Sequence, residues 1–127
     1  MPPDIDVISK RIIGAAIRVH RTLGPGLLEK TYLRCLAHEL TLAGHTVELQ
    51  KSLPVVYKGI TVSDAYHIDL LVDGLVIIEL KAVAAVNDIH RAQLLTYLKL
   101  SNKPLGLLLN FNGRRLSDGI IRVINTP

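Results

Sequence analysis

Apolar residues recur at helical spacing in three segments of the chain. In the first, residues 6–22, they return every three or four positions, which predicts an amphipathic helix, and a Gly-Pro-Gly stretch follows it. A second helix is predicted over residues 27–43, with Gly44 just past its end. A third is predicted over residues 88–100, because Asn87 is a good N-cap.

Runs of aliphatic and β-branched residues between and after these helices predict strands. They cover residues 46–49, 53–57, 60–62, 66–72, 75–81, 105–111 and 119–124. The order of two helices, five strands, one helix and two strands (ααβββββαββ) predicts an α/β fold with a central mixed sheet flanked by helices. Because no repeat or linker interrupts the pattern, we expect a single domain over residues 1–127.

The segment of residues 67–81 breaks the apolar pattern at three charged positions. Asp69, Glu79 and Lys81 lie in strands that are otherwise apolar enough to be buried on both faces. An unpaired buried charge is costly, so these groups need partners. The side chains of Glu79 and Lys81 share one face of their strand, because successive side chains alternate.

The turn at Asp73-Gly74 decides where Asp69 points. A two-residue loop sends Asp69 and Glu79 to opposite faces, whereas an odd loop, such as a type I turn with Gly74 in a bulge, puts them together. Only the odd register makes one face wholly apolar, with Ile68 on that face. We therefore predict that Asp69, Glu79 and Lys81 converge.

Two converging carboxylates without cysteine favour Mg²⁺ or Mn²⁺, which prefer oxygen ligands. An adjacent lysine can orient water or neutralise charge on a phosphate. A buried ion pair between Lys81 and one of the acids, without metal, is the alternative that these residues leave open.

Charge is distributed unevenly over the 127 residues, whose net charge is +4. Residues 35–90 carry seven acidic and three basic side chains, whereas residues 91–127 carry one acidic and six basic ones. Residues 1–34 carry six basic and three acidic side chains, so the acidic middle lies between two basic flanks, which suit a polyanionic partner. The single cysteine excludes an internal disulfide, no apolar run is long enough for a membrane span, and the Met-Pro-Pro start lacks a secretory signal. A cytoplasmic location is expected.

The spacing of Asp69 and Glu79-Leu80-Lys81 resembles the signature of the PD-(D/E)XK nuclease superfamily. Residues 26–32 resemble the motif that names its GxxExxY proteins, and residues 90–97 resemble the QxxxY helix also found in RecB-like and Cas4-like nucleases. Residues 106–111 and 119–122 are similar to the closing strands of that branch. The resemblance implies a restriction-endonuclease-like core.

The resemblance also implies roles for individual residues. Glu29, Asp69, Glu79 and the backbone carbonyl of Leu80 would bind the metal, and Lys81 would act on the attacking water. Further candidates for lining the site or contacting nucleic acid are Gln93, Tyr97, His67, His90 and Tyr32.

These features predict a metal-dependent deoxyribonuclease that uses Mg²⁺ or Mn²⁺ and binds DNA without reading its sequence. A homodimer is possible, because one small domain with one site needs a second copy to cut both strands at once. A non-catalytic nucleic-acid-binding or regulatory module with the same fold is the first alternative. An antitoxin-like or scaffold protein that binds a partner through its basic face is the second.

Overall fold

The computed structural model describes residues 4–126. Residues 1–3, on which the expectation about a secretory signal depends, lie outside the described part, as does residue 127. In chain order the elements are α1 (Ile5–Leu23), α2 (Glu29–Leu42), β1 (Val47–Tyr57), β2 (Ile60–Val72), β3 (Val76–Lys81), α3 (Asp88–Ser101), β4 (Leu105–Asn110), the 3-10 helix η1 (Leu116–Gly119) and β5 (Ile120–Ile124). None of the described helices is long and apolar enough to cross a membrane.

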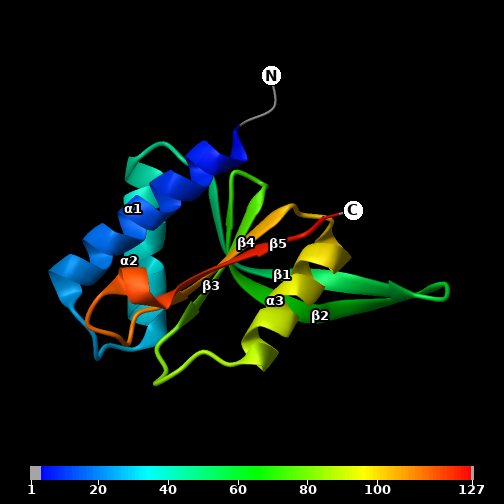
Figure 1. The fold of residues 1–127 in the computed structure, drawn as a ribbon. Coiled ribbons are helices and arrows are strands. Elements are labelled where there is room, and N and C mark those ends of the chain that lie inside the picture. The colour runs from blue at the N-terminus through cyan, green and yellow to red at the C-terminus, as the bar shows by residue number, and fades with distance from the viewer. Residues whose placement is uncertain (1–3, 127) are drawn as a thin grey trace.

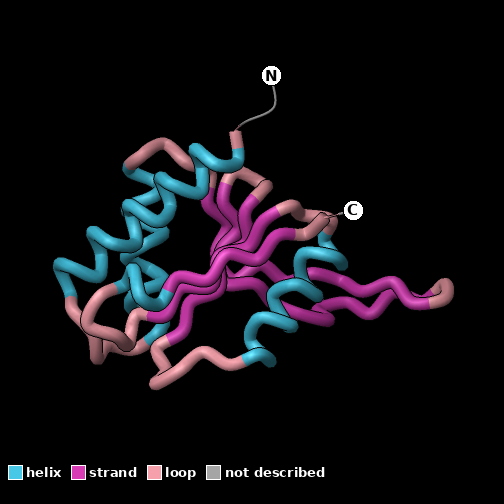
Figure 2. The backbone as a smooth tube through the Cα atoms, viewed as in Figure 1, coloured by secondary structure: helices cyan, strands magenta, loops and turns pink. Residues whose placement is uncertain are grey.

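The strands form one mixed sheet in the order β1-β2-β3-β4-β5, which confirms the predicted α/β fold (Figure 1). All neighbouring strands are antiparallel except β3 and β4, which run parallel because α3 connects them. The helices α1 and α2 cover one face and α3 covers the other, so the molecule has three layers (Figure 2). β3 is the middle strand of the sheet, and β2 is its antiparallel neighbour.

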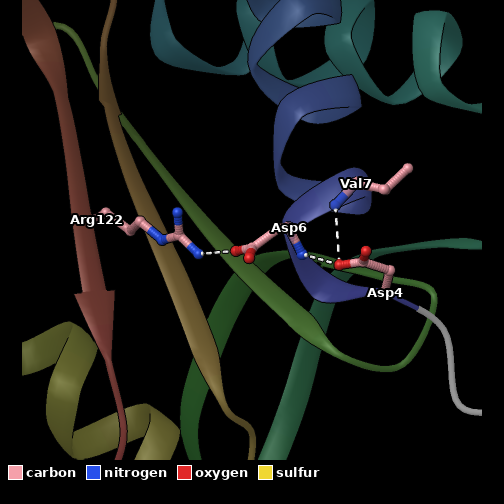
Figure 3. Close-up of polar contacts among 4 residues, drawn as sticks. All are labelled: Asp4, Asp6, Val7 and Arg122. Atoms are coloured by element: carbon pink, nitrogen blue, oxygen red, sulfur yellow. Dashed lines mark hydrogen bonds and ion pairs between the residues drawn. The ribbon is translucent and has the colours of Figure 1, made fainter.

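Local signals explain where the helices begin and end. The Asp4 side chain accepts from the amides of Asp6 and Val7 at the start of α1, and Asp6 forms an ion pair with Arg122 of β5 (Figure 3). Asn87 caps α3 as predicted. Gly44 follows α2 with φ 93°, a conformation that other residues adopt only with strain.

The sequence prediction of five strands before α3 is wrong in number, because the structure has three. The predicted breaks are bulges inside two long strands. Leu53 pairs with Tyr66 and Val55 with Val62, so residues 63–65 lie opposite Pro54 alone. Proline is tolerated there because β1 is an edge strand and its outer amides have no ladder partner.

Two apolar clusters lie on either side of the sheet. The larger contains α1, α2 and the side chains of β2, β3 and β4 that face them, and the smaller lies under α3. Every residue of β3 except Lys81 is buried, which is typical of a strand with a parallel neighbour and helices on both faces. Glu79 is therefore enclosed by packed neighbours, which restrict the movement of its side chain.

Candidate active site

The β2–β3 hairpin has the odd register that the apolar pattern predicts. Leu70 pairs with Ile78 and Val72 with Val76, which leaves three residues in the loop. The turn itself differs from the expected type I turn. Asp73 and Gly74 both have positive φ, at 54° and 68°, and the Leu75 amide donates to the Val72 carbonyl. Aspartate and glycine tolerate this left-handed turn, and the extra residue sets the register.

Asp69 and Glu79 face each other where the backbone ladder of this hairpin stops. The Leu80 amide donates to Asp69 Oδ2 at 2.8 Å, and the Asp69 amide donates to Glu79 Oε1 at 3.2 Å. Each carboxylate thus accepts from a backbone amide of the opposite strand, which in a regular ladder would donate to a backbone carbonyl. This reciprocal exchange fixes both side chains against the sheet and brings two acids together.

Electrostatics at this pair are unfavourable for two negative charges. Glu79 is only 7% exposed, and burial followed by the charge of Asp69 raises the pKa of Glu79 to about 8. The positive charge of Lys81, which lies half-buried two residues further along β3, acts in the opposite direction but is a weaker influence. Near neutral pH the pair therefore holds a proton, and a cation that replaced this proton would relieve the repulsion.

Ile68 lies on a different face from the one its alternation predicts. It packs with Tyr66, Leu71 and Ile77 in the cluster under α3, not with Leu70 on the face toward α1 and α2. The alternation is interrupted at Asp69, and Gln50, which lies across from Asp69 on β1, has a left-handed φ of 47°. This distortion of both strands lies where the Asp69 carboxylate accepts from the Leu80 amide.

Glu29 reaches the same end of the sheet but not the carboxylate pair. It is the first residue of α2, it is exposed, and its Oε1 accepts from the amide of Ala82, the residue after Lys81. Within residues 4–126, no three His, Cys, Asp or Glu side chains gather closely enough to hold a metal together. In this structure Glu29 is thus held by the amide of Ala82, apart from the carboxylate pair, and its role as a metal ligand stays a prediction.

The two remaining carboxylates fit a divalent cation of the magnesium type. They present only oxygen atoms, they lie side by side, and the pKa of Glu79 is raised first by burial and then by the negative charge of Asp69. The Leu80 peptide is held at the pair through its amide. The ligand role of the Leu80 carbonyl stays a prediction.

Tyr97 of α3 packs on the side of the sheet that α3 covers, and its role at the site stays a prediction. It is half-buried, and burial followed by the charges of Glu79 and Asp69 raises its pKa. The Tyr97 ring stacks on that of Tyr66, with centroids 4.7 Å apart. The sequence reasoning did not identify Tyr66 as a neighbour of the site, although its place three residues before Asp69 in β2 is a usable signal.

The other predicted contacts differ in how they are placed. Gln93 is exposed one helical turn before Tyr97, and His67 is exposed on β2. His90 belongs to the N-terminal cap of α3, where its Nδ1 accepts from the amide of Asn87. Tyr32 has no exposed surface, because its ring stacks on Phe111, so it supports the site from inside the core rather than lining a surface.

Asn110 at the end of β4 is a site neighbour that the sequence reasoning missed. It pairs with Lys81 across the parallel ladder, and its side chain donates to the carbonyl of Val83 and accepts from its amide. These two bonds fix the loop that leaves β3 directly after Lys81. A polar residue at the end of an apolar strand is the signal that could have identified it.

Comparison with known proteins identifies a family for this chain. A family model described as the PD-(D/E)XK nuclease superfamily matches residues 6–123, which include the carboxylate pair, Lys81 and the helix α3. No curated protein and no solved structure matches the chain. With nearly its whole length matched by one family model, the chain belongs to the PD-(D/E)XK nuclease superfamily.

Proposed function

We propose that the protein is a metal-dependent nuclease that hydrolyses phosphodiester bonds of DNA. Its superfamily implies a nucleic-acid substrate. The observation that carries the proposal is the carboxylate pair of Asp69 and Glu79, in which Glu79 is buried and each acid accepts a backbone amide from the opposite strand. Mg²⁺ or Mn²⁺ is the proposed cofactor, since both prefer oxygen ligands.

Asp69, Glu79 and Lys81 have different roles in the proposed reaction. Asp69 and Glu79 hold the ion, which when bound would polarise the phosphate and lower the pKa of water. Lys81 orients the attacking water and offsets charge that develops on the phosphate, since it lies on the same face of β3 as Glu79. The backbone bonds of the pair keep both acids in place before substrate arrives.

Other site residues enter the proposal in secondary roles. Glu29, whose Oε1 accepts from the Ala82 amide, and the carbonyl of Leu80 would complete the set of residues that hold the ion. Gln93 and Tyr97 are assigned to contact with the bound strand, and exposed His67 and the cap residue His90 are further candidates for that contact. Tyr32 was predicted to line the site or contact nucleic acid, but its ring is buried, so we assign it a structural role.

The finer assignment to the GxxExxY branch is also part of the proposal. The motif residues at 26–32 support it, because Tyr32 organises the segment that leads into Glu29. The Tyr32 hydroxyl donates to the carbonyl of Gly24 and accepts from the amide of Leu27. One site in a chain of this size makes a homodimer the simplest way to cut both strands together.

Cleavage assays with labelled single-stranded, double-stranded and branched DNA and RNA test the proposal, with and without Mg²⁺ or Mn²⁺. We expect metal-dependent cleavage of DNA that Glu79→Gln and Lys81→Ala each abolish. Glu48→Gln and Lys51→Ala are matched controls, because that exposed pair on β1 loses the same charges elsewhere. Cleavage that persists in both site variants would rule out this site.

A non-catalytic module that retains the fold is the second candidate. One observation favours it, because Glu29, Asp69 and Glu79 each accept from a backbone amide and so have structural partners. It predicts no heat of Mn²⁺ binding that depends on Asp69 and Glu79. It also predicts nucleic-acid affinity that survives the loss of Glu79 and Lys81 together, which calorimetry and a binding titration measure.

A further inference from the structure

The loop that follows β4 is tied directly to the strand that carries Lys81. The Phe111 amide donates to the Lys81 carbonyl at 2.8 Å. Asn110 Oδ1 accepts from the amide of Asn112 as well as from that of Val83. The first residues of this loop are therefore fixed relative to the carboxylate pair.

Buried aromatic groups hold the same loop from below. His20 Nε2 lies 2.9 Å from the Gly113 carbonyl and 3.2 Å from the Phe111 carbonyl, so Nε2 carries the proton and donates to both, since carbonyls only accept. The ring of Phe111 stacks on Tyr32 with centroids 4.5 Å apart. The end of α1, the segment before Glu29 and the loop after β4 are thus one connected unit (Figures 1 and 2).

Three arginines extend from this unit into solvent. Arg21 lies in the last turn of α1, and Arg114 and Arg115 follow the anchored part of the loop. Together with Ser117 they line a concave surface with a volume of about 300 Å³. We call Arg21, Arg114 and Arg115 the arginine surface.

Over residues 4–126, no ion pair joins an acidic side chain to Arg21, Arg114 or Arg115. The ion pairs found over residues 4–126 join Arg18 to Glu39, His45 to Asp73, Lys51 to Glu48 and Arg122 to Asp6. Three neighbouring guanidinium groups repel one another, and an anion relieves that repulsion. Guanidinium matches phosphate oxygens with two parallel hydrogen bonds, which makes a phosphate the best-suited anion.

We propose that the arginine surface binds the sugar–phosphate backbone of the DNA strand that is cut at Asp69 and Glu79. This rests on the proposed function and adds where the strand lies. Arg115 is four residues beyond Phe111, so its Cα lies at most about 14 Å from that of Phe111. Phosphates of one strand follow at about 3.4 Å of duplex axis, so the contacted phosphates lie a few nucleotides from the cut.

Binding is measured in EDTA, so that cleavage is not needed, with fluorescein-labelled single-stranded and duplex DNA at several salt concentrations. The test variant carries Arg21→Gln, Arg114→Gln and Arg115→Gln. The matched control carries Lys10→Gln, Arg11→Gln and Lys58→Gln, which remove the same charge from the start of α1 and the tip of the β1–β2 hairpin. Circular dichroism checks that both variants fold.

The arginine variant should bind DNA at least about tenfold more weakly near physiological salt, with the slope of log affinity against log salt reduced by about 2–3. The control should change both quantities much less. Equal losses in the two variants, or an unchanged salt slope in the arginine variant, would overturn the proposal. For DNA cleavage in Mn²⁺, the arginine variant should have a higher KM than the wild type and nearly the same kcat.

The binding result and the proposed function can fail separately. If the protein does not cleave DNA in any metal but the arginine variant still loses affinity, the arginine surface stands and the nuclease proposal fails. If the protein cleaves and the arginine variant binds and cleaves as before, the nuclease proposal stands and the arginine surface fails.

Discussion

His45 Nδ1 lies 2.7 Å from Asp73 Oδ2, and this contact clamps the turn of the hairpin that carries the carboxylate pair. The other oxygen of Asp73 accepts from the amide of Thr46 at 2.9 Å, so one side chain joins the start of β1 to the β2–β3 turn. His45 is almost fully buried, and its Nε2 has no partner within residues 4–126. The contact to Asp73 is therefore the one polar anchor of this ring.

Replacing Asp73 should destabilise the fold through the loss of this clamp. Asp73→Ala removes both bonds and places alanine at a φ of 54°, and we expect a loss of about 1–3 kcal/mol in the free energy of unfolding. Asp73→Asn keeps an acceptor and tolerates the left-handed backbone, so it should lose less. Urea denaturation measures both, and an alanine variant as stable as the asparagine variant would contradict the clamp.

The pKa of Glu79 predicts how stability depends on pH in the metal-free protein. Between its ordinary value of 4.5 and about 8, the folded state keeps a proton that the unfolded state has lost. The contribution of Glu79 is therefore greatest below pH 4.5 and is lost as the pH rises to about 8, with a slope of at most about 1.4 kcal/mol per pH unit.

Glu79→Gln removes this contribution, because glutamine does not titrate. The difference in unfolding free energy between this variant and the wild type should grow from pH 5 to pH 8 in EDTA, since only the wild type loses stability at this position. Glu48→Gln, on the exposed part of β1, should follow the wild type at every pH. A constant difference between Glu79→Gln and the wild type would show that Glu79 has no raised pKa.

Divalent metal should reverse this loss of stability. An ion that binds the folded state alone stabilises it by about 2.7 kcal/mol at a concentration one hundred times Kd. We expect Mn²⁺ to raise the Tm of the wild type, EDTA to remove the effect, and Asp69→Asn with Glu79→Gln to abolish it. A rise in Tm that survives in the double variant would place the ion elsewhere.

Two substitutions of Tyr97 distinguish a role in stability from a role in contact with the substrate. Tyr97→Phe keeps the stack on Tyr66 and should leave stability within about 0.5 kcal/mol, whereas Tyr97→Ala should lose about 1–3 kcal/mol through burial and stacking. If the hydroxyl contacts the strand, Tyr97→Phe should lower cleavage severalfold with Tm unchanged. Cleavage equal to wild type in Tyr97→Phe would limit Tyr97 to a structural role.

The apolar pattern was sufficient for the element types and for the register that brings Asp69 opposite Glu79. Both depend on local periodicity and on which face of a strand is apolar. The pattern failed where a bulge replaced a loop, as at Pro54, because only the partner strand distinguishes the two. It failed at Ile68 for a related reason, since the interrupted alternation at Asp69, opposite Gln50 of β1, is visible only when the two strands are paired.

The site features that the sequence did not predict depend on contacts between distant parts of the chain. Tyr32 was expected at the surface of the site, but Phe111 buries its ring from far along the sequence. His20 has no motif around it, and its role appears only when the loop after β4 folds over the end of α1. The position of Glu29 depends on one bond to Ala82, which no spacing in the sequence indicates.

The exchange of amide bonds between Asp69 and Glu79 affects how an inactive protein should be made. Alanine at either position leaves a strand amide without an acceptor, so a loss of cleavage could reflect a frayed sheet. Asparagine and glutamine remove the negative charge and keep the acceptor. For trapping uncut DNA, an isosteric pair of substitutions is therefore the appropriate reagent, and alanine at these positions is an ambiguous one.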